Sequence, residues 1–235
     1  MVLINPNTSA ATTRMMTTVA RRALAGSGIR VRGVTVTTGP VMLTDPASLR
    51  AAAPQVVAAA HEALTAGDCA ALLVAAFGDP GVTELRSAAL GVPVLGIGEA
   101  ALAEAASGDR RFGIATTTPR LAAAIAAHVE RLGLTSRYTG ARFTPGAPEH
   151  LAAHPEKQLA ALEAAVHACA VRDGAEAVVI GGGPLGETAE VLRARGLTLP
   201  VIAPIPTACR RIAGLLGTGP PDPAPRVTGL PGAPP

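Results

Sequence analysis

Aromatic residues are scarce in this chain of 235 residues. Three Phe, one Tyr and no Trp together make up 2% of the sequence. Proteins that bind single-stranded nucleic acid usually stack bases on aromatic rings, and this composition argues against such a platform. We therefore expect no nucleic-acid partner, and a core built from Ala, Val, Leu and Ile.

Cysteine is also rare. The three cysteines, Cys69, Cys169 and Cys209, are odd in number and show no C-x-x-C spacing. This pattern favours reduced thiols and a cytoplasmic location. His150 and His154 stand four residues apart, but a proline follows His154 and disfavours helical geometry there. With no third ligand evident, we expect no metal site.

Charged residues make up only 16% of the chain, and the net charge is +3. The basic residues occur in short scattered pairs, such as Arg21 with Arg22 and Arg110 with Arg111. Such pairs are typical of a solvated surface and not of a stripe that follows phosphates.

Long apolar runs are missing as well. A membrane-spanning helix needs about 20 apolar residues, and the longest apolar stretch, residues 69–77, has the length of a strand. The first residues, MVLINP, show neither a basic segment nor a long apolar one. We therefore expect no membrane association and no signal peptide.

Hydrophobic residues nevertheless make up 49% of the sequence. Short β-branched runs alternate with Ala-rich amphipathic stretches, which predicts an α/β fold with a mainly parallel sheet. The expected strands are residues 2–5, 29–36, 70–76, 93–97, 111–115, 137–143, 177–180 and 200–203. The expected helices are residues 9–25, 46–66, 82–90, 100–106, 119–132, 155–173, 187–195 and 206–216.

This order repeats once along the chain. Ala76 and Gly182, at the ends of equivalent strands, lie 106 residues apart, and Pro93 and Pro200, which open the next strands, lie 107 apart. We expect an N-terminal α/β half over residues 1–108 and a C-terminal half over residues 109–217. The last helix has the option of packing back on the first half. Residues 218–235, rich in Pro and Gly, are expected to be disordered.

Ligands of open parallel sheets bind beyond the carboxyl ends of the strands. Four loops at such ends are polar or Gly-rich: residues 5–9, 77–81, 116–119 and 181–186. Each opens a helix and offers backbone N–H groups to a carboxylate, a phosphate or a developing oxyanion. The expected ligand contacts are Asn7, Thr8, Ala76, Phe77, Gly78, Thr116, Thr117, Gly182 and Gly183. Alternatively, the hydroxyls of this set are helix caps only.

One of these loops contains a glycine pattern. Gly181, Gly183 and Gly186 fit G-x-G-x-x-G, but a dinucleotide site needs this pattern in the first βα unit and an acidic residue about 20 positions later. The next strand end, residues 201–204, reads VIAP and has no acid. We therefore expect no nicotinamide cofactor, and no Walker loop is present.

Several segments carry a resemblance to a known family. They are residues 4–9 (INPNTS), 75–81 (AAFGDPG), 96–100 (GIGEA), 115–118 (ATTT) and 179–185 (VIGGGPL). Together they resemble the Asp/Glu/hydantoin racemase superfamily, with hydantoin racemase the most similar branch. The resemblance implies two pseudo-symmetric, flavodoxin-like parallel-sheet halves with the active site between them, and a reaction that uses no cofactor.

The resemblance also implies a mechanism from which this chain departs. In the family, two cysteine thiols face opposite sides of the substrate carbon; one removes a proton and the other returns one. The corresponding positions here hold Ala76 and Gly182. Backbone donors in the loops would still stabilise an enolate, but the two-thiol mechanism cannot be transferred.

Three functions remain open. The first is a racemase of an amino-acid derivative or hydantoin that uses other acid–base groups, with Asp79 and Glu99 as candidates because both follow strand ends. Both carboxylates have the alternative role of stabilising helix N-termini. The second is a cofactor-independent lyase similar to arylmalonate decarboxylases, and the third is a non-catalytic protein that binds a small carboxylate or cyclic ureide. Homo-oligomers are common in the family and are a further expectation.

Overall fold

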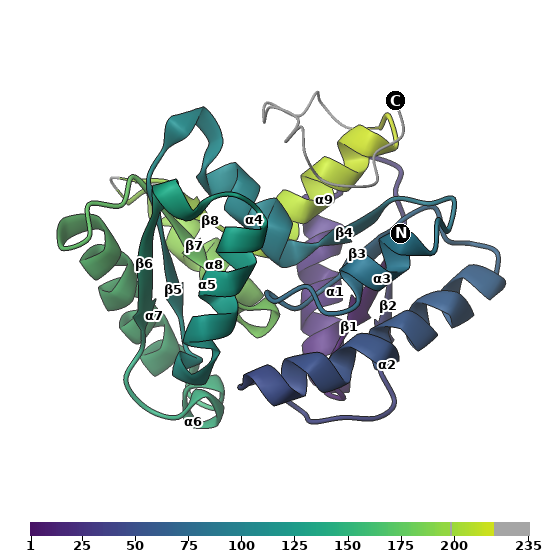
Figure 1. Cartoon of the computed structure of the whole chain (residues 1–235), viewed down its shortest axis with the longest axis horizontal. Coiled ribbons are helices and arrows are strands. Elements are labelled where there is room, and N and C mark those ends of the chain that lie inside the picture. Colours follow the sequence, from purple (N-terminus) through teal and green to yellow (C-terminus); the bar gives the residue numbers. More distant parts are fainter. Residues whose placement is uncertain (198, 219–235) are drawn as a thin grey trace.

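The computed structural model describes residues 1–197 and 199–218 and contains two four-stranded parallel sheets, one in each half of the chain (Figure 1). The strand order is β2-β1-β3-β4 in the first sheet and β6-β5-β7-β8 in the second. The predicted α/β class with two matching parallel-sheet halves is therefore confirmed. Apart from Thr218, the tail that was expected to be disordered lies outside the described residues.

The first half follows a regular alternation of strands and helices. Its elements are β1 (Val2–Asn5), α1 (Ala10–Ala23), β2 (Arg32–Thr35), α2 (Pro46–Thr65), β3 (Leu72–Val74), α3 (Val82–Ser87), β4 (Val94–Gly96) and α4 (Ile97–Ala105). The central strands β1 and β3 are buried along their whole length, as expected of strands covered by helices on both faces.

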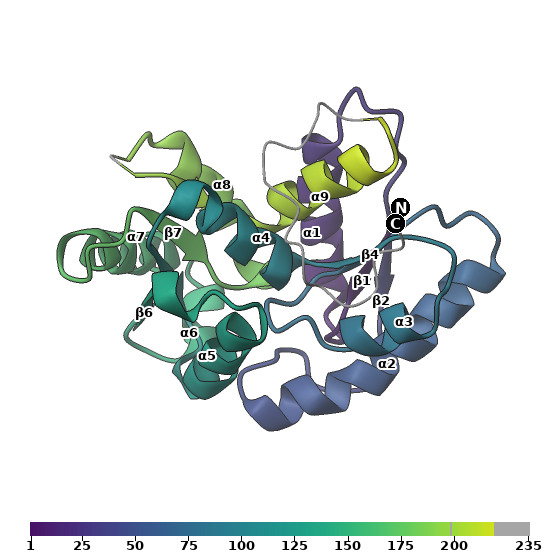
Figure 2. The ribbon, with the colours of Figure 1, turned by 45° about the horizontal axis from the view of Figure 1, so that its top comes forward.

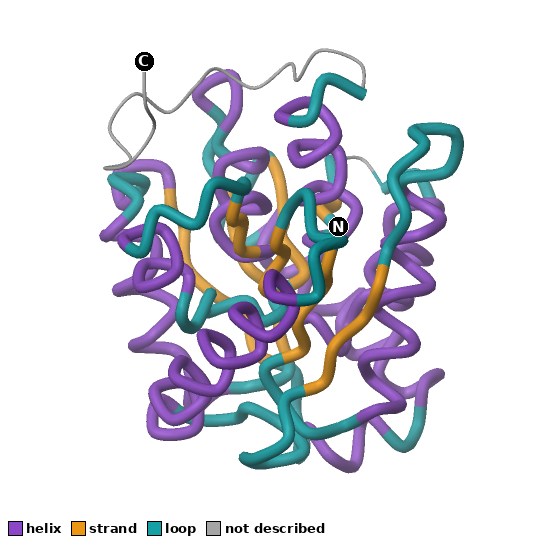
Figure 3. The backbone as a smooth tube through the Cα atoms, turned by 90° about the vertical axis from the view of Figure 1, so that its right-hand side faces the viewer, coloured by secondary structure: helices purple, strands orange, loops and turns teal. Residues whose placement is uncertain are grey.

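The second half repeats this order with a few short additions. Its elements are η1 (Ser107–Asp109), β5 (Phe112–Thr116), η2 (Pro119–Leu121), α5 (Ala122–Arg131), η3 (Thr135–Arg137), β6 (Tyr138–Phe143), α6 (Pro148–Ala152), α7 (Pro155–Val171), β7 (Ala177–Ile180), η4 (Gly183–Leu185), α8 (Gly186–Ala194), β8 (Val201–Ile202) and α9 (Pro204–Leu215). Figure 3 shows the strands inside and the helices on the outer sides.

Strand lengths are set by pairing. The β-branched residues at 29–36 predicted a long strand, but β2 comprises only Arg32–Thr35 because its partner β1 offers four residues, Val2 to Asn5, for the ladder. The α6 helix was not predicted, since five residues give too short a pattern.

Helix starts follow the local sequence. The Ser9 hydroxyl accepts a hydrogen bond from the Thr12 N–H at 3.2 Å and caps α1. Asp45 caps α2 in the same way, with its carboxylate on the Ser48 N–H at 2.8 Å. This contact, more than the neighbouring Arg120, holds the pKa of Asp45 below its usual value.

The last helix crosses back to the first half. Ile205, Cys209 and Ile212 of α9 are buried in one apolar cluster with Leu3 of β1 and Met16 of α1. Figure 2 shows α9 beside α1 and α4. Across residues 1–197 and 199–218, no helix has both the length and the hydropathy to span a membrane.

Candidate active site

A pocket lies between the two halves at the carboxyl ends of the strands. Residues 75–78, after β3, and residues 181–185, after β7, form its floor. Asn7 joins them from the loop after β1, and Thr117 and Thr118 from the loop after β5. The four strand-end loops that the sequence singled out thus meet at one pocket, because equivalent strands of the two sheets end towards each other.

Most of the predicted contact residues line this pocket. They are Asn7, Ala76, Phe77, Gly78, Thr117, Gly182 and Gly183. Several backbone N–H groups among them, those of Phe77, Gly78 and Gly183, have no acceptor among the described residues. They are available as donors for an oxygen atom of a ligand.

Thr8 and Thr116 do not line the pocket. The Thr8 N–H donates to the Pro40 carbonyl at 3.1 Å, which holds the loop after β2 in place. Thr116 is fully buried, and its hydroxyl donates to the Gly181 carbonyl at 2.6 Å. The two threonines therefore position neighbouring loops and are not part of the pocket wall.

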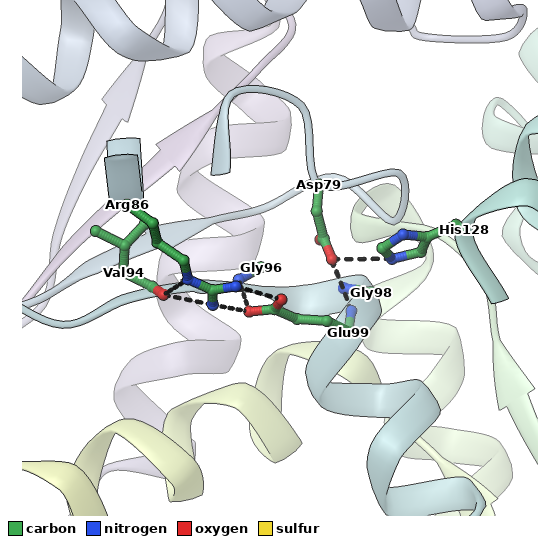
Figure 4. A network of polar contacts seen from close by, with 7 residues as sticks. All are labelled: Asp79, Arg86, Val94, Gly96, Gly98, Glu99 and His128. Carbon is green, nitrogen blue, oxygen red and sulfur yellow. Dashed lines mark hydrogen bonds and ion pairs between the residues drawn. The ribbon is translucent and has the colours of Figure 1, made fainter. Parts of the chain in front are cut away.

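Asp79, one of the two candidate acid–base residues, caps a helix. Its backbone is left-handed, with φ of 51°, and its carboxylate accepts hydrogen bonds from the Gly98 and Glu99 N–H groups at 2.8 and 2.6 Å, at the start of α4 (Figure 4). The same carboxylate lies 3.0 Å from Nε2 of His128. Asp79 is buried and reaches the pocket only through this histidine.

Glu99, the other candidate, is held in an ion pair. Its carboxylate contacts the Arg86 guanidinium and accepts a hydrogen bond from the Gly96 N–H at 3.1 Å. Arg86 in turn donates to the Val94 carbonyl (Figure 4). Glu99 is not part of the pocket wall, and its contacts tie α3 to the start of α4.

His128 has the only ionisable side chain among the described residues that line the pocket. Only 4% of the residue is exposed. Its Nδ1 lies 2.5 Å from the Arg131 guanidinium, which can only donate, so Nδ1 accepts and Nε2 carries the proton towards Asp79. Both ring nitrogens are thus engaged.

Gln158 is a second polar residue that the sequence did not single out. It lies in the second turn of α7, lines the pocket, and is 8% exposed. The Thr188 hydroxyl of α8 donates to its Oε1 at 2.9 Å. No motif marks either His128 or Gln158, because each lies within a helix and becomes part of the site only through packing.

The rest of the wall is apolar. The first half contributes Met42, Leu43 and Leu49, and the second half contributes Leu121 and Ile125 among others. No Lys or Arg of the described residues lines the pocket. A group with one negative charge would therefore depend on backbone and amide donors.

Comparison with known proteins gives the family. The model of the family described as Asp/Glu/Hydantoin racemase matches residues 1–212. This chain belongs to that family. A hydantoin racemase of Paenarthrobacter aurescens is 26% identical over 219 residues, which cover 93% of this chain and 91% of the relative. A hydantoin racemase of Rhizobium meliloti is 31% identical over 149 residues, or 63% of this chain and 61% of the relative.

Solved structures with a similar fold agree with this architecture. An allantoin racemase from Pseudomonas fluorescens has a TM-score of 0.82 at 26% identity, covering 92% of this chain and 90% of the other. An arylmalonate decarboxylase has a TM-score of 0.64 at 19% identity, with coverage of 91% and 92%. At that identity the likeness to the decarboxylase concerns the fold alone.

No cysteine of the described residues lines the pocket. Cys169 and Cys209 are buried away from it and Cys69 is half-buried. Burial, together with the negative charge of the nearby Asp173, raises the pKa of Cys169 to about 11. Burial also raises the pKa of Cys209 to about 12. Protonated thiols of this kind are poor bases and poor nucleophiles at neutral pH.

The described residues also contain no group of three His, Cys, Asp or Glu side chains suited to a metal ion. His150 and His154 lie with their rings 4.2 Å apart, and Nδ1 of His154 is 2.7 Å from the His150 carbonyl.

Proposed function

We propose that this racemase-family protein exchanges the proton on a carbon next to a carbonyl in a small cyclic ureide or amino-acid derivative, without a cofactor. The observation that carries the proposal is the meeting of two strand-end loops, one from each half, at a pocket with unpaired N–H groups on both sides. The similarity to hydantoin and allantoin racemases supports a ureide as the substrate class.

The enolate that forms in such a reaction needs donors aimed at its oxygen. In this proposal the N–H groups of Phe77, Gly78 and Gly183 supply them. In other enzymes, removal of one preorganised oxyanion-hole donor costs about 2.7–4 kcal/mol of transition-state stabilisation.

The acid–base group in this proposal is His128, with Asp79 as the residue that orients it. Ala76 and Gly182 occupy the positions that hold thiols elsewhere in the family. A carboxylate hydrogen-bonded to one ring nitrogen fixes the tautomer and stabilises the imidazolium that forms when the other nitrogen takes a proton. The other nitrogen becomes available when the exposed Arg131 side chain moves aside.

Binding without turnover is the second candidate. It is favoured by the absence of a pocket thiol and by the engagement of both His128 nitrogens in the structure. A ligand would then be held by the same donors with no proton transferred.

Isotope exchange separates these functions. The protein is incubated in heavy water with 5-benzylhydantoin, allantoin, aspartate, glutamate or phenylmalonate, each beside an enzyme-free control. We expect deuterium at the 5-position of the two ureides above the control, and no change after treatment with iodoacetamide. Carbon dioxide from phenylmalonate would identify a lyase instead. Ligand-induced thermal stabilisation without exchange would identify a binding protein and refute the proposed reaction.

A further inference from the structure

The Gln158 carboxamide is hydrogen-bonded to Thr188 at the pocket wall. Its oxygen accepts the Thr188 hydroxyl at 2.9 Å, and the residue is more than nine-tenths buried. Its amide nitrogen has no acceptor among the described residues, although it is not sealed from solvent. Since the residue lines the pocket, this nitrogen is an unused, oriented donor there.

Asn7 shows the same arrangement on the other half. Its Oδ1 accepts from the Ser9 N–H and from the Asn5 side chain, both at 2.9 Å, and its own amide nitrogen has no acceptor among the described residues. The pocket thus has two carboxamides, one from each half. The oxygen of each accepts hydrogen bonds from the protein, and the nitrogen of each has no acceptor among the described residues. Side-chain amides oriented in this way recognise hydrogen-bond acceptors and discriminate against donors.

We infer that Gln158 binds a second carbonyl oxygen of the substrate, the one remote from the reacting carbon, and that Thr188 positions it. The inference rests on the proposed function, in which the oxygen next to the reacting carbon is taken by the backbone N–H groups. Gln158 belongs to α7, on a different part of the wall from the loops that supply those groups. In a hydantoin the remote oxygen is that of the carbonyl between the two ring nitrogens.

The apolar surroundings strengthen this selectivity. No cationic side chain of the described residues lines the pocket, so a neutral carbonyl is easier to accommodate there than a second carboxylate. Sites built to hydrogen-bond a substrate atom reject analogues that lack it, because the buried protein group is then left unpaired. Gln158 therefore favours neutral cyclic ureides over dicarboxylates.

The test pairs a change in the protein with a change in one ligand atom. Calorimetry gives Kd for 5-benzylhydantoin and for 5-benzyl-2-thiohydantoin, whose sulfur is a weaker acceptor, with the wild type and with Gln158→Leu. We expect Gln158→Leu to weaken hydantoin binding about tenfold and thiohydantoin binding less than threefold, as loss of one hydrogen bond predicts. Equal weakening of both ligands, or of neither, would overturn the inference.

The positioning role of Thr188 is tested with two substitutions of that residue. Thr188→Val removes the hydroxyl that orients the amide, whereas Thr188→Ser keeps it. We expect the valine variant to raise KM for hydantoin exchange several-fold with little change in kcat, and the serine variant to restore it. A valine variant that matches the serine variant would show that the contact has no role in binding.

Failure of this inference can be told from failure of the proposed function. If the wild type binds the hydantoin but exchanges no proton, the reaction is refuted while the Kd comparison still decides the role of Gln158. If exchange occurs and Gln158→Leu leaves both Kd values unchanged, only the role of Gln158 is refuted. A wild type that binds neither ligand overturns the inference as well.

Discussion

In the structure, the Arg131 guanidinium is hydrogen-bonded to Nδ1 of His128. His128 is buried in α5 and lines the pocket, and Asp79, from the other half of the chain, lies 3.0 Å from its Nε2. Because Arg131 is exposed, moving its guanidinium into water costs little free energy compared with desolvating a buried group. In the proposed mechanism, Arg131 therefore competes with the substrate proton for Nδ1.

Substitutions at these residues test that assignment. We expect His128→Gln to lower the rate of isotope exchange at least a hundredfold, as loss of a general base typically does. Arg131→Met should raise the rate several-fold, because Nδ1 is released. Arg14→Met, at an exposed position of α1, is the control and should leave the rate unchanged. A slower Arg131→Met enzyme would contradict the role of Nδ1 as the base.

The two candidate carboxylates illustrate how much sequence position alone conveys. Their location after strand ends identified a helix N-terminal role as the alternative, and that is how the structure uses both side chains, on α4. The link from Asp79 to His128 joins residues 49 positions apart, and no local pattern encodes it.

At the scale of elements, the loop after β7 is built around a close approach to β3. A Cβ added at Gly183 would lie 2.3 Å from the Ala75 carbonyl oxygen and 2.8 Å from the Met16 sulfur. This oxygen belongs to the backbone directly after β3 and cannot move aside alone, so only glycine lets the two strand-end loops face each other across the pocket.

Gly183→Ala should therefore separate the loops. We expect at least a tenfold loss of ureide binding and a lower midpoint of urea unfolding, because the alanine cannot fit without a backbone shift. The control is Gly186→Ala in the same segment, where the nearest atoms are ends of the Ile205, Met15 and Val19 side chains at 3.2 Å or more. Equal effects of the two substitutions would show that the close approach is not what matters.

For the molecule as a whole, contacts between the halves hold the pocket together. Arg22 of α1 pairs with Glu190 of α8, and Arg120 donates to the Thr44 hydroxyl at 2.9 Å. The α9 helix, which follows the last strand of the second half, completes the apolar core of the first. The division at residues 108 and 109 is therefore proposed as a boundary between repeats and not between independent folding units.

The contribution of α9 can be measured with one buried and one exposed residue. Ile212 is fully buried in the cluster with α1 and β1, and Leu215 is 61% exposed. We expect Ile212→Ala to lower the free energy of unfolding by about 2–5 kcal/mol, and Leu215→Ala by roughly 0.5 kcal/mol or less. Urea unfolding of the whole chain gives both values. A similar, small effect of the two substitutions would mean that α9 is only loosely attached.

Local patterning was sufficient for the class of fold, the repeat and the loops that face the pocket, because the central strands are apolar runs and several helices begin at a capping residue or a proline. The strand ladder shortened β2 and β3, since pairing depends on the partner and not on the run itself. Packing alone decided the roles of His128 and Gln158, because each side chain acquires its hydrogen-bond partner from an element distant along the chain.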